Sequence, residues 1–415
     1  MIPRQDFLDR ESPRGVEVYQ LTQGELPCSH VYMEAQIFTP DASRLIIHQA
    51  ATAHGGRRDN PAHQYLLCDL TAGGQLIPLT EEPGAWAPSV SPDGQWMYYF
   101  VDTTEPGQGR IELKRVKLDG SWRESILVLD SLIPGTRRKA SRLYPLSTIS
   151  SDGQRLAISA FLGDGRRPSP PFGLLVFDLT KATVNLVLEG PSWCNMHSQY
   201  CRSLDPREAH DILIQENHGC VVSHEGKVEQ LVGEPGADIH VIRDDGSNFR
   251  TMPWGRDGIE HCQGHQCWRG RSTWAITSTT TYWPKEFGRE KENQLIEGKA
   301  RPDVGHLGLK TPGACRNELS RLISQPGFWH FATDISGQYF ISDIYQAGKP
   351  PAIAIAKLGT PGVDPLLDYT YVCSTKTSYI KESHPHPFLS PDGKLGFFNS
   401  DETGLLQAYL IRLPW

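Results

Sequence analysis

The sequence predicts an all-β fold, a seven-bladed β-propeller whose ring is closed by the N-terminal strand. Three observations support this prediction. A turn phrase of the SPDG type recurs along the chain, and each copy belongs to a unit of four short strands that repeats about every 55 residues. The last unit lacks its fourth strand, and a segment near the N-terminus can supply it. A β-solenoid or a pair of β-sandwiches would also repeat strands, but solenoid coils are much shorter than these units.

The turn phrase marks the hairpin between the first and second strands of each unit. The clearest copies are FTPDASRLIIHQ (38–49), VSPDGQWMYYF (90–100), ISSDGQRLAIS (149–159) and LSPDGKLGFFN (389–399); the weaker ones are SLDPREAHDILIQ (203–215), CWRGRSTWAIT (267–277) and TDISGQYFISD (333–343). An Asp-Gly pair readily adopts the positive φ that such a tight turn requires. These copies define seven units.

The third and fourth strands follow each turn phrase. Third strands are predicted at YLLCDL, LKRVKL, LLVFDL, IHVIRDDG, AIAIAKL and LQAYLIRL, and short fourth strands at LIPLT, VNLVL and PLLDYT. The last unit ends at its third strand, so we expect GVEVYQLT at 15–22 to pair with LQAYLIRL and close the ring. The chain is then one propeller domain, 1–415, with an insertion around 284–326 in the fifth blade.

Composition narrows the possible functions. The 415 residues are 38% hydrophobic and 21% charged with a net charge of −7, which suits a globular chain with a large core. Apart from RRK at 137–139 there is no basic tract, which argues against a nucleic-acid partner. No apolar run is long enough to span a membrane, and the N-terminus shows no signal-peptide pattern. Nine cysteines without regular spacing favour a reduced, cytoplasmic chain.

Polar residues recur at one position before the turn. The first strand of a propeller blade lines the central channel, so a residue that recurs at a fixed distance from the turn should face that channel. Counting six residues back from the turn residue gives Gln199, His330 and His386 in the fourth, sixth and seventh units. His265 precedes the strand of the fifth unit in the same way, and His197 is in phase with His384.

The phrase HPHPF places His384 and His386 on alternate positions. The neighbouring prolines disfavour helix, and an extended chain would send both imidazoles to the same side. Converging imidazoles would repel one another if protonated, whereas neutral imidazole is a good ligand for a bound cation. We therefore expect His330, His384 and His386 to form a site for a divalent metal.

Four motifs, in order, carry a family resemblance. They are His-x-Gln (His197 to Gln199), Gly-His-x-x-Trp (Gly264 to Trp268), Trp-His (Trp329 and His330) and HPHPFLSPDG. In this order, from about Gly15 to the C-terminus, the chain resembles oligogalacturonate lyases of polysaccharide lyase family 22. The resemblance implies a seven-bladed propeller that binds a divalent metal, usually manganese, and cleaves short uronic-acid oligosaccharides by β-elimination.

The resemblance also implies roles for individual residues. The metal ligands would be His330, His384 and His386, joined in the family by a Gln three residues before the first histidine of the pair. Here that position holds Lys381, and an ammonium group has no lone pair to offer a metal. Either the metal keeps three histidines and water, or the ammonium takes over part of the charge role. The general base would be His265, and the residues expected to bind substrate are His197, Gln199, Arg202 and Lys381.

Several alternatives remain open at this point. Lys381 and the insertion are compatible with a lyase or hydrolase acting on another uronate linkage, such as rhamnosyl-glucuronate, and a non-catalytic binding propeller is a third reading. His265 could be a fourth metal ligand, with His197 or a tyrosine as base. The cluster HCQGHQC (261–267) matches no standard zinc spacing. Arg269 could bind a second substrate carboxylate.

Overall fold

In the computed structural model the chain forms two compact units. The described residues are 1–53, 55–56, 60–103, 109–166, 170–233, 236–254, 260–281, 292–300, 315–319, 326–346, 348–360, 367–380 and 382–415. The first unit contains Met1–Glu81, His265–Glu297 and Asn317–Trp415, and the second contains Glu82–Gly264 and Gly298–Arg316. Nearly all regular structure in these ranges is β-strand, the exception being one short 3-10 helix, η1 (Gln5–Phe7). None of the described segments forms a helix with the length and apolar character needed to cross a membrane.

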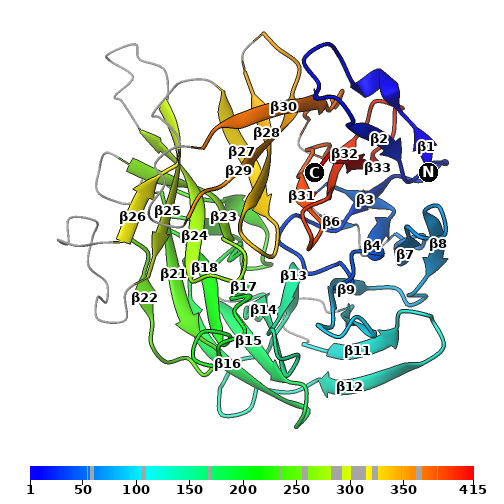
Figure 1. The fold of residues 1–415 in the computed structure, drawn as a ribbon. Coiled ribbons are helices and arrows are strands. Elements are labelled where there is room, and N and C mark those ends of the chain that lie inside the picture. The colour runs from blue at the N-terminus through cyan, green and yellow to red at the C-terminus, as the bar shows by residue number, and fades with distance from the viewer. Residues whose placement is uncertain are drawn as a thin grey trace. The chain divides into compact units, whose positions relative to one another are not determined.

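The first unit contains the first, sixth and seventh blades. The first blade has the order β3 (Cys28–His30), β4 (Arg44–Gln49), β7 (Gln64–Asp69) and β8 (Gln75–Pro78), with β5 (Ala51–Thr52) and β6 (Gly55–Gly56) as a separate ribbon; the sixth has β27 (Gly327–Thr333), β28 (Tyr339–Tyr345), β29 (Ala352–Lys357) and β30 (Tyr369–Ser374). Each is an antiparallel meander in which consecutive strands pair (Figure 1).

The second unit contains the second, third and fourth blades. They consist of β9 (Ala85–Val90), β10 (Trp96–Asp102), β11 (Ile111–Lys117) and β12 (Arg123–Leu129); β13 (Arg142–Ile149), β14 (Arg155–Phe161), β15 (Phe172–Asp178) and β16 (Thr183–Gly190); and β17 (Gln199–Tyr200), β18 (Asp211–Asn217), β21 (Ala237–Arg243) and β22 (Arg250–Thr251). A two-stranded ribbon of β19 (Val221–Val222) and β20 (Val228–Gln230) interrupts the fourth blade.

The fifth blade differs from the sequence prediction. Its strands are β23 (Glu260–Trp268), β24 (Trp274–Thr281), β25 (Glu292–Lys299) and β26 (Cys315–Glu318). Two of them, β25 and β26, fall inside the range 284–326 that we expected to be an insertion. Part of that range therefore supplies the third and fourth strands of the blade, and much of the remainder lies outside the described residues.

The seventh blade joins the two ends of the chain. It has the order β31 (Phe388–Leu389), β32 (Leu395–Ser400), β33 (Gln407–Arg412), β2 (Glu17–Gln20) and β1 (Ile2–Pro3). Glu17 pairs with Arg412 and Gln20 with Tyr409 in an antiparallel register. The predicted closure by the N-terminal strand is confirmed, and so is the all-β fold with seven blades across the described residues.

The repeated turn phrase has the expected local chemistry. Gly94, Gly153 and Gly393 have φ values of 68°, 72° and 72°, the region that favours glycine. In the last of these turns, the Ser390 hydroxyl donates to Asp392 Oδ1 at 2.6 Å and the Lys394 backbone N–H donates to the same oxygen at 3.2 Å. The serine and aspartate thus satisfy backbone and side-chain polar groups where the hairpin reverses.

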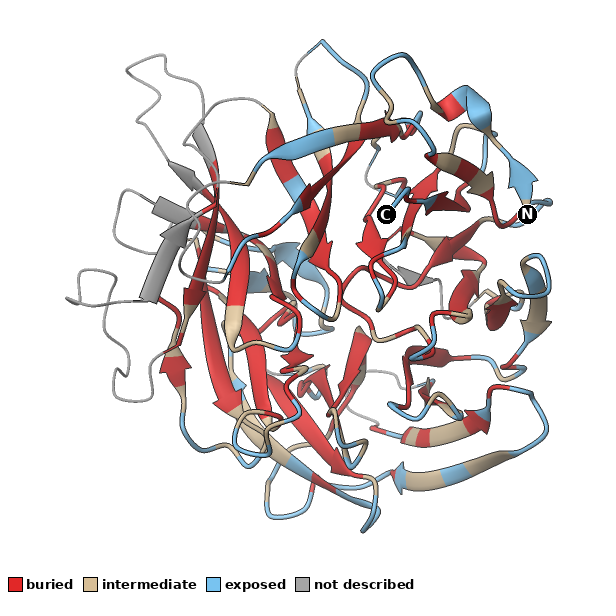
Figure 2. Cartoon of the chain, in the orientation of Figure 1, coloured by how far each residue is buried: buried red, intermediate tan, exposed pale blue. Residues whose placement is uncertain are grey.

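The core lies on the faces of the sheets. The central strands are buried almost throughout, as the uniformly buried β15 illustrates (Figure 2). In the second unit, Trp86 on β9 donates from Nε1 to the Leu143 carbonyl on β13 at 3.1 Å, and both side chains join one apolar cluster of the second and third blades. Such contacts fix neighbouring blades within a unit.

Candidate metal centre

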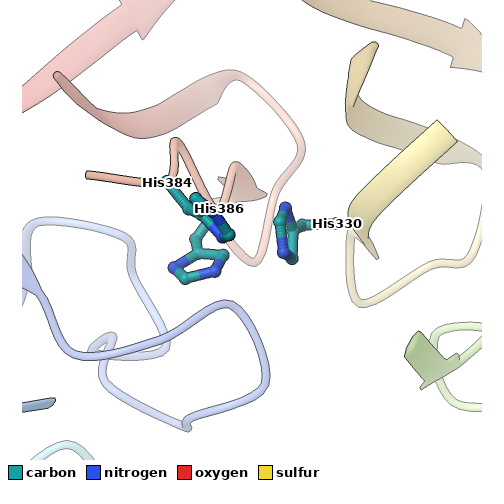
Figure 3. A group of neighbouring side chains, drawn as sticks. All are labelled: His330, His384 and His386. Carbon is teal, nitrogen blue, oxygen red and sulfur yellow. The ribbon is translucent and has the colours of Figure 1, made fainter. Parts of the chain in front are cut away.

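Three histidines of the first unit converge. His330 lies on β27, while His384 and His386 lie in the loop before β31, and Figure 3 shows the three side chains grouped together. One ring nitrogen from each can be chosen so that all three lie within 4.8 Å of one another. The ring centroids of His330 and His386 are 4.2 Å apart, and those of His384 and His386 are 5.5 Å apart. His330 and His386 are buried, and His384 is partly exposed.

A β-bulge and an aspartate position His330. The register between β27 and β28 shifts between Phe328 and Phe331, so Trp329 and His330 together oppose Asp343. The His330 backbone N–H donates to Asp343 Oδ1 at 2.7 Å, and its ring Nδ1 lies 2.9 Å from Asp343 Oδ2. With Nδ1–H donated to the carboxylate, Nε2 keeps its lone pair for a metal.

Tyr379 completes the support behind His330. Its hydroxyl donates to Asp343 Oδ2 at 2.7 Å, and its ring centroid lies 4.9 Å from that of His384. Burial raises the pKa of Tyr379, and the neighbouring Asp343 charge raises it further, so the hydroxyl stays protonated and acts as a donor. Sequence reasoning missed Asp343 and Tyr379. A signal for Asp343 was present, since it is the one charged residue in the apolar strand YFISDIY.

His384 and His386 converge for a different reason from the one predicted. The segment 383–387 is not a strand, and His386 has a φ of 44°, in the left-handed region. A backbone kink, rather than strand alternation, brings the second imidazole back toward the first. Tyr32 packs edge-on against His386 with ring centroids 4.7 Å apart, and His30 Nε2 lies 3.4 Å from the Pro385 carbonyl oxygen. These contacts hold the kinked loop.

His265 lies beside the three histidines. It belongs to β23 rather than preceding the strand, and its ring centroid is 4.6 Å from that of His330. The preceding Gly264 has a φ of 89°, and a Cβ there would lie 2.9 Å from Gln215 Nε2, so this position favours glycine on two counts. His265 is partly exposed, which suits a group that must reach a bound molecule.

Three of the residues predicted to bind substrate belong to the second unit, and the fourth is Lys381. His197, Gln199 and Arg202 belong to the second unit, where the buried His197 Nε2 lies 3.2 Å from the Tyr144 hydroxyl and 3.0 Å from Asn195 Nδ2. Lys381 lies outside the described residues.

Arg269 does not fit the role suggested for it. Its side chain is buried and forms an ion pair with Glu297, and it also donates to the carbonyl oxygens of Gly337 and Gly359. It is therefore a structural arginine and not a free carboxylate-binding group.

The three imidazoles fit a divalent cation. First-row metals bind imidazole nitrogen at about 2.1 Å, so two ligand atoms are at most about 4.2 Å apart around the ion. The observed limit of 4.8 Å requires only small side-chain movements. The carboxylate of Asp343 behind His330 is the kind of partner that orients a metal-bound histidine.

Fold and site together define a class of protein: a β-propeller that carries a histidine-rich candidate metal centre. No family model matches the chain. Among curated proteins, the oligogalacturonate lyase of Dickeya dadantii is 22% identical over 424 residues, covering 98% of this chain and 95% of the relative. The oligogalacturonide lyase of Pectobacterium atrosepticum is 22% identical over 430 residues with the same coverage.

Solved structures give the same result for the fold. An oligogalacturonate lyase in complex with manganese aligns with a TM-score of 0.69 and 20% identity, covering 98% of this chain and 95% of that one. The oligogalacturonate lyase of Vibrio parahaemolyticus aligns with a TM-score of 0.67 and 19% identity, covering 97% and 95% of the two chains. The resemblance predicted from the four motifs is confirmed: the chain is similar to oligogalacturonate lyases along nearly its whole length.

Proposed function

We propose that this protein is a metal-dependent lyase that cleaves short uronic-acid oligosaccharides of the oligogalacturonate type by β-elimination. The observation that carries the proposal is the convergence of His330, His384 and His386 with His265 beside them. The full-length similarity to two curated lyases of this kind supports it.

His330, His384 and His386 would hold the metal, and we propose Mn²⁺ because a structurally similar lyase is described in complex with manganese. When bound, such an ion supplies a positive charge that draws electron density from a uronate carboxylate and so acidifies the adjacent C5–H. Asp343 fixes the tautomer and the orientation of His330, and the kink at His386 directs the second imidazole of the pair.

His265 is the proposed general base. A neutral imidazole has an intrinsic pKa suited to accepting a proton near pH 7. It takes the C5 proton, the electron pair forms the C4–C5 double bond, and the C4–O bond to the neighbouring sugar breaks. The departing oxygen takes up one proton from water and becomes a hydroxyl, so the products are an unsaturated uronate and a shortened sugar.

Substrate binding is proposed for His197, Gln199, Arg202 and Lys381. Gln199 and Arg202 offer an amide and a guanidinium, groups that recognise sugar hydroxyls and carboxylates. A lysine at position 381, where the related motif has a glutamine, places a cation near the histidine pair in sequence. This substitution favours a second candidate, a lyase for another uronate linkage such as rhamnosyl-glucuronate.

A cytoplasmic location is also proposed. Eight cysteines whose side chains the structure describes are free thiols, and all of these but Cys220 are buried, which favours a reducing compartment.

A substrate panel tests the function. The purified protein is offered digalacturonate, longer galacturonides and rhamnosyl-glucuronate, each with Mn²⁺ and with a chelator, while the ultraviolet absorbance of the unsaturated uronate is followed. We expect absorbance to rise with Mn²⁺ and digalacturonate and to stay flat with the chelator. A rise only with rhamnosyl-glucuronate would select the second candidate, and no rise with any uronide would contradict both.

A further inference from the structure

A second cluster of metal-ligating side chains lies in the fourth blade. Glu216 on β18 is the direct cross-strand partner of Asp238 on β21, so the two carboxylates stand on one face. His240 follows Asp238 by two residues on β21 and so shares that face. His218 lies in the turn just after β18, and its Nε2 is 3.0 Å from Asp238 Oδ2. Because the strands are antiparallel, the two histidines flank the carboxylate pair from opposite ends, and all four groups belong to the second unit.

The distances suit a single small cation. His240 Nε2 lies 3.2 Å from Glu216 Oε2, and His218 Nε2 lies 3.0 Å from Asp238 Oδ2 and 3.7 Å from Glu216 Oε2. The ligand atoms of Glu216, Asp238 and His240 all lie within 4.8 Å of one another. A tetrahedral ion with bonds of about 2.0–2.1 Å has ligand atoms about 3.3–3.4 Å apart, and the carboxylate–imidazole separations are close to this value. His218 is outside the group of three whose ligand atoms all lie within 4.8 Å of one another, so it would complete the sphere by turning toward the ion.

Outer hydrogen bonds orient two of the ligands. His240 Nδ1 lies 3.2 Å from the Thr251 hydroxyl on β22, so donation from Nδ1–H leaves the Nε2 lone pair facing Glu216. The Ser192 hydroxyl donates to Glu216 Oε1 at 2.5 Å, which turns the other carboxylate oxygen toward the imidazoles. Partners of this kind behind the ligands are characteristic of metal sites.

Charge and burial also favour a cation over two simple ion pairs. His240 is fully buried between the aromatic rings of Trp193 and Phe249, whose centroids lie 5.7 Å and 4.7 Å from its own. Keeping an imidazolium in such apolar surroundings is costly, and like charges directly opposite in a sheet repel. Two carboxylates, two neutral imidazoles and one divalent cation together have no net charge.

We propose that Glu216, His218, Asp238 and His240 bind a structural divalent cation of the zinc class, clamping β18 to β21. Two imidazoles and two carboxylates form a four-coordinate nitrogen and oxygen set that zinc accepts. This site shares no residue with the candidate centre of His330, His384 and His386, and it does not depend on the proposed lyase activity. Its role is in stability, since metal bound only by the folded chain raises the free energy of unfolding.

Zinc titration of the full-length chain tests this site. The background is the His384→Ala, His386→Ala double variant, which lacks two ligands of the first centre. After chelator treatment and buffer exchange, this double variant is titrated with Zn²⁺ in competition with a chromophoric chelator. The same titration is made on a triple variant that also carries His218→Gln. His218 is partly exposed, and glutamine keeps a hydrogen-bonding group toward Asp238, so the added change should fold. His224→Ala, at an exposed histidine of the same unit, is the matched control.

We expect the background and the His224→Ala control to bind one more equivalent of Zn²⁺ than the His218→Gln variant. Zn²⁺ should also raise the thermal midpoint of the first two proteins and leave that of the third unchanged. Co²⁺ in place of Zn²⁺ should give the intense visible bands of a four-coordinate site, which the His218→Gln variant lacks. The site is refuted if the background binds no Zn²⁺, or if the His218→Gln variant binds as much Zn²⁺ as the background. Should His218→Gln fail to fold, Asp238→Asn provides the same comparison.

Discussion

Asp343 uses both of its carboxylate oxygens as acceptors. Oδ1 accepts from the His330 backbone, and Oδ2 accepts from the His330 ring and from the Tyr379 hydroxyl. In Asp343→Asn one oxygen becomes an NH₂ group that must face a donor, so His330 loses its fixed orientation. We expect the affinity for Mn²⁺ to fall about 10- to 100-fold, the usual effect of losing such a partner. Calorimetric titration measures it.

Tyr379→Phe is the matched control for that variant. It removes one donor from Asp343 and leaves both hydrogen bonds to His330 in place, so its Mn²⁺ affinity should change less than that of Asp343→Asn. Equal Mn²⁺ affinity in the wild type and Asp343→Asn would show that the carboxylate does not organise the centre.

Substitution of His265 tells whether this residue is the general base or a fourth metal ligand. Its ring lies against His330, yet it does not belong to the group whose nitrogens converge on one point. We expect His265→Ala to retain its metal while elimination slows by about 10²- to 10⁴-fold, the range for losing a general base. Metal analysis and initial rates are measured on the same preparation. Loss of metal in this variant would make His265 a fourth ligand, and an unchanged rate would remove it from the mechanism.

At the scale of residues, the sequence indicated which histidines converge better than it indicated the side chains and backbone conformation around them. Counting back from the turn residue found His330 and His386 because the repeat places equivalent positions at equivalent points of each blade. The kink at His386 was missed, since prolines on either side suggest extended chain and the positive φ depends on contacts with the first blade. Tyr379 was missed because its partner Asp343 lies 36 residues away.

At the scale of elements, the closure of the seventh blade depends on more than strand pairing. Phe7, in η1 just before β2, is 1% exposed and packs against Phe398 and Tyr409, with ring centroids 5.8 Å and 5.0 Å away. Phe7→Ala should lower the free energy of unfolding by about 3–5 kcal/mol because a large buried ring leaves a cavity. Urea unfolding measures it.

Ile2→Ala is the control for the closure. Ile2 is 39% exposed on the edge strand β1, so its truncation should cost about 0.5 kcal/mol or less. Similar losses in the two variants would mean that Phe7 does not anchor the N-terminal segment to the last blade.

Elements were predictable where the repeat is regular. The Ser-x-Asp-Gly turns, the hairpins around them and the closing strand all follow from local signals. The fifth blade was misread because its third and fourth strands, β25 and β26, are separated from β24 and from each other by long connections. Without a turn phrase to mark them, their sequences could not be told from an insertion.

At the scale of the whole molecule, buried histidines predict how stability depends on pH. Burial lowers the pKa of His30 from 6.5 to about 3, and burial together with the charge of His63 lowers the pKa of His48. The folded state keeps these imidazoles neutral, whereas the unfolded chain takes up protons below pH 6.5. The stability they provide is therefore present above pH 6.5 and is lost as the pH falls toward 3.

Unfolding at two pH values tests this dependence. From pH 7.5 to pH 5, His30 alone should lower the free energy of unfolding by about 2 kcal/mol. His30→Gln keeps a donor toward the Pro385 carbonyl and cannot be protonated, so its loss of stability over the same interval should be smaller by about that amount. An identical loss in the wild type, in His30→Gln and in the exposed-site control His224→Ala would contradict the assignment.

The measurement that tests the central claim most directly combines metal content with elimination. The wild type and the His384→Ala, His386→Ala double variant are stripped with a chelator, then assayed on digalacturonate before and after Mn²⁺ is added. We predict that the stripped wild type forms no unsaturated product and recovers with Mn²⁺, while the double variant binds less metal and stays inactive. Full activity in the stripped wild type, or equal recovery in the double variant, would contradict the claim that these histidines hold the metal on which cleavage depends.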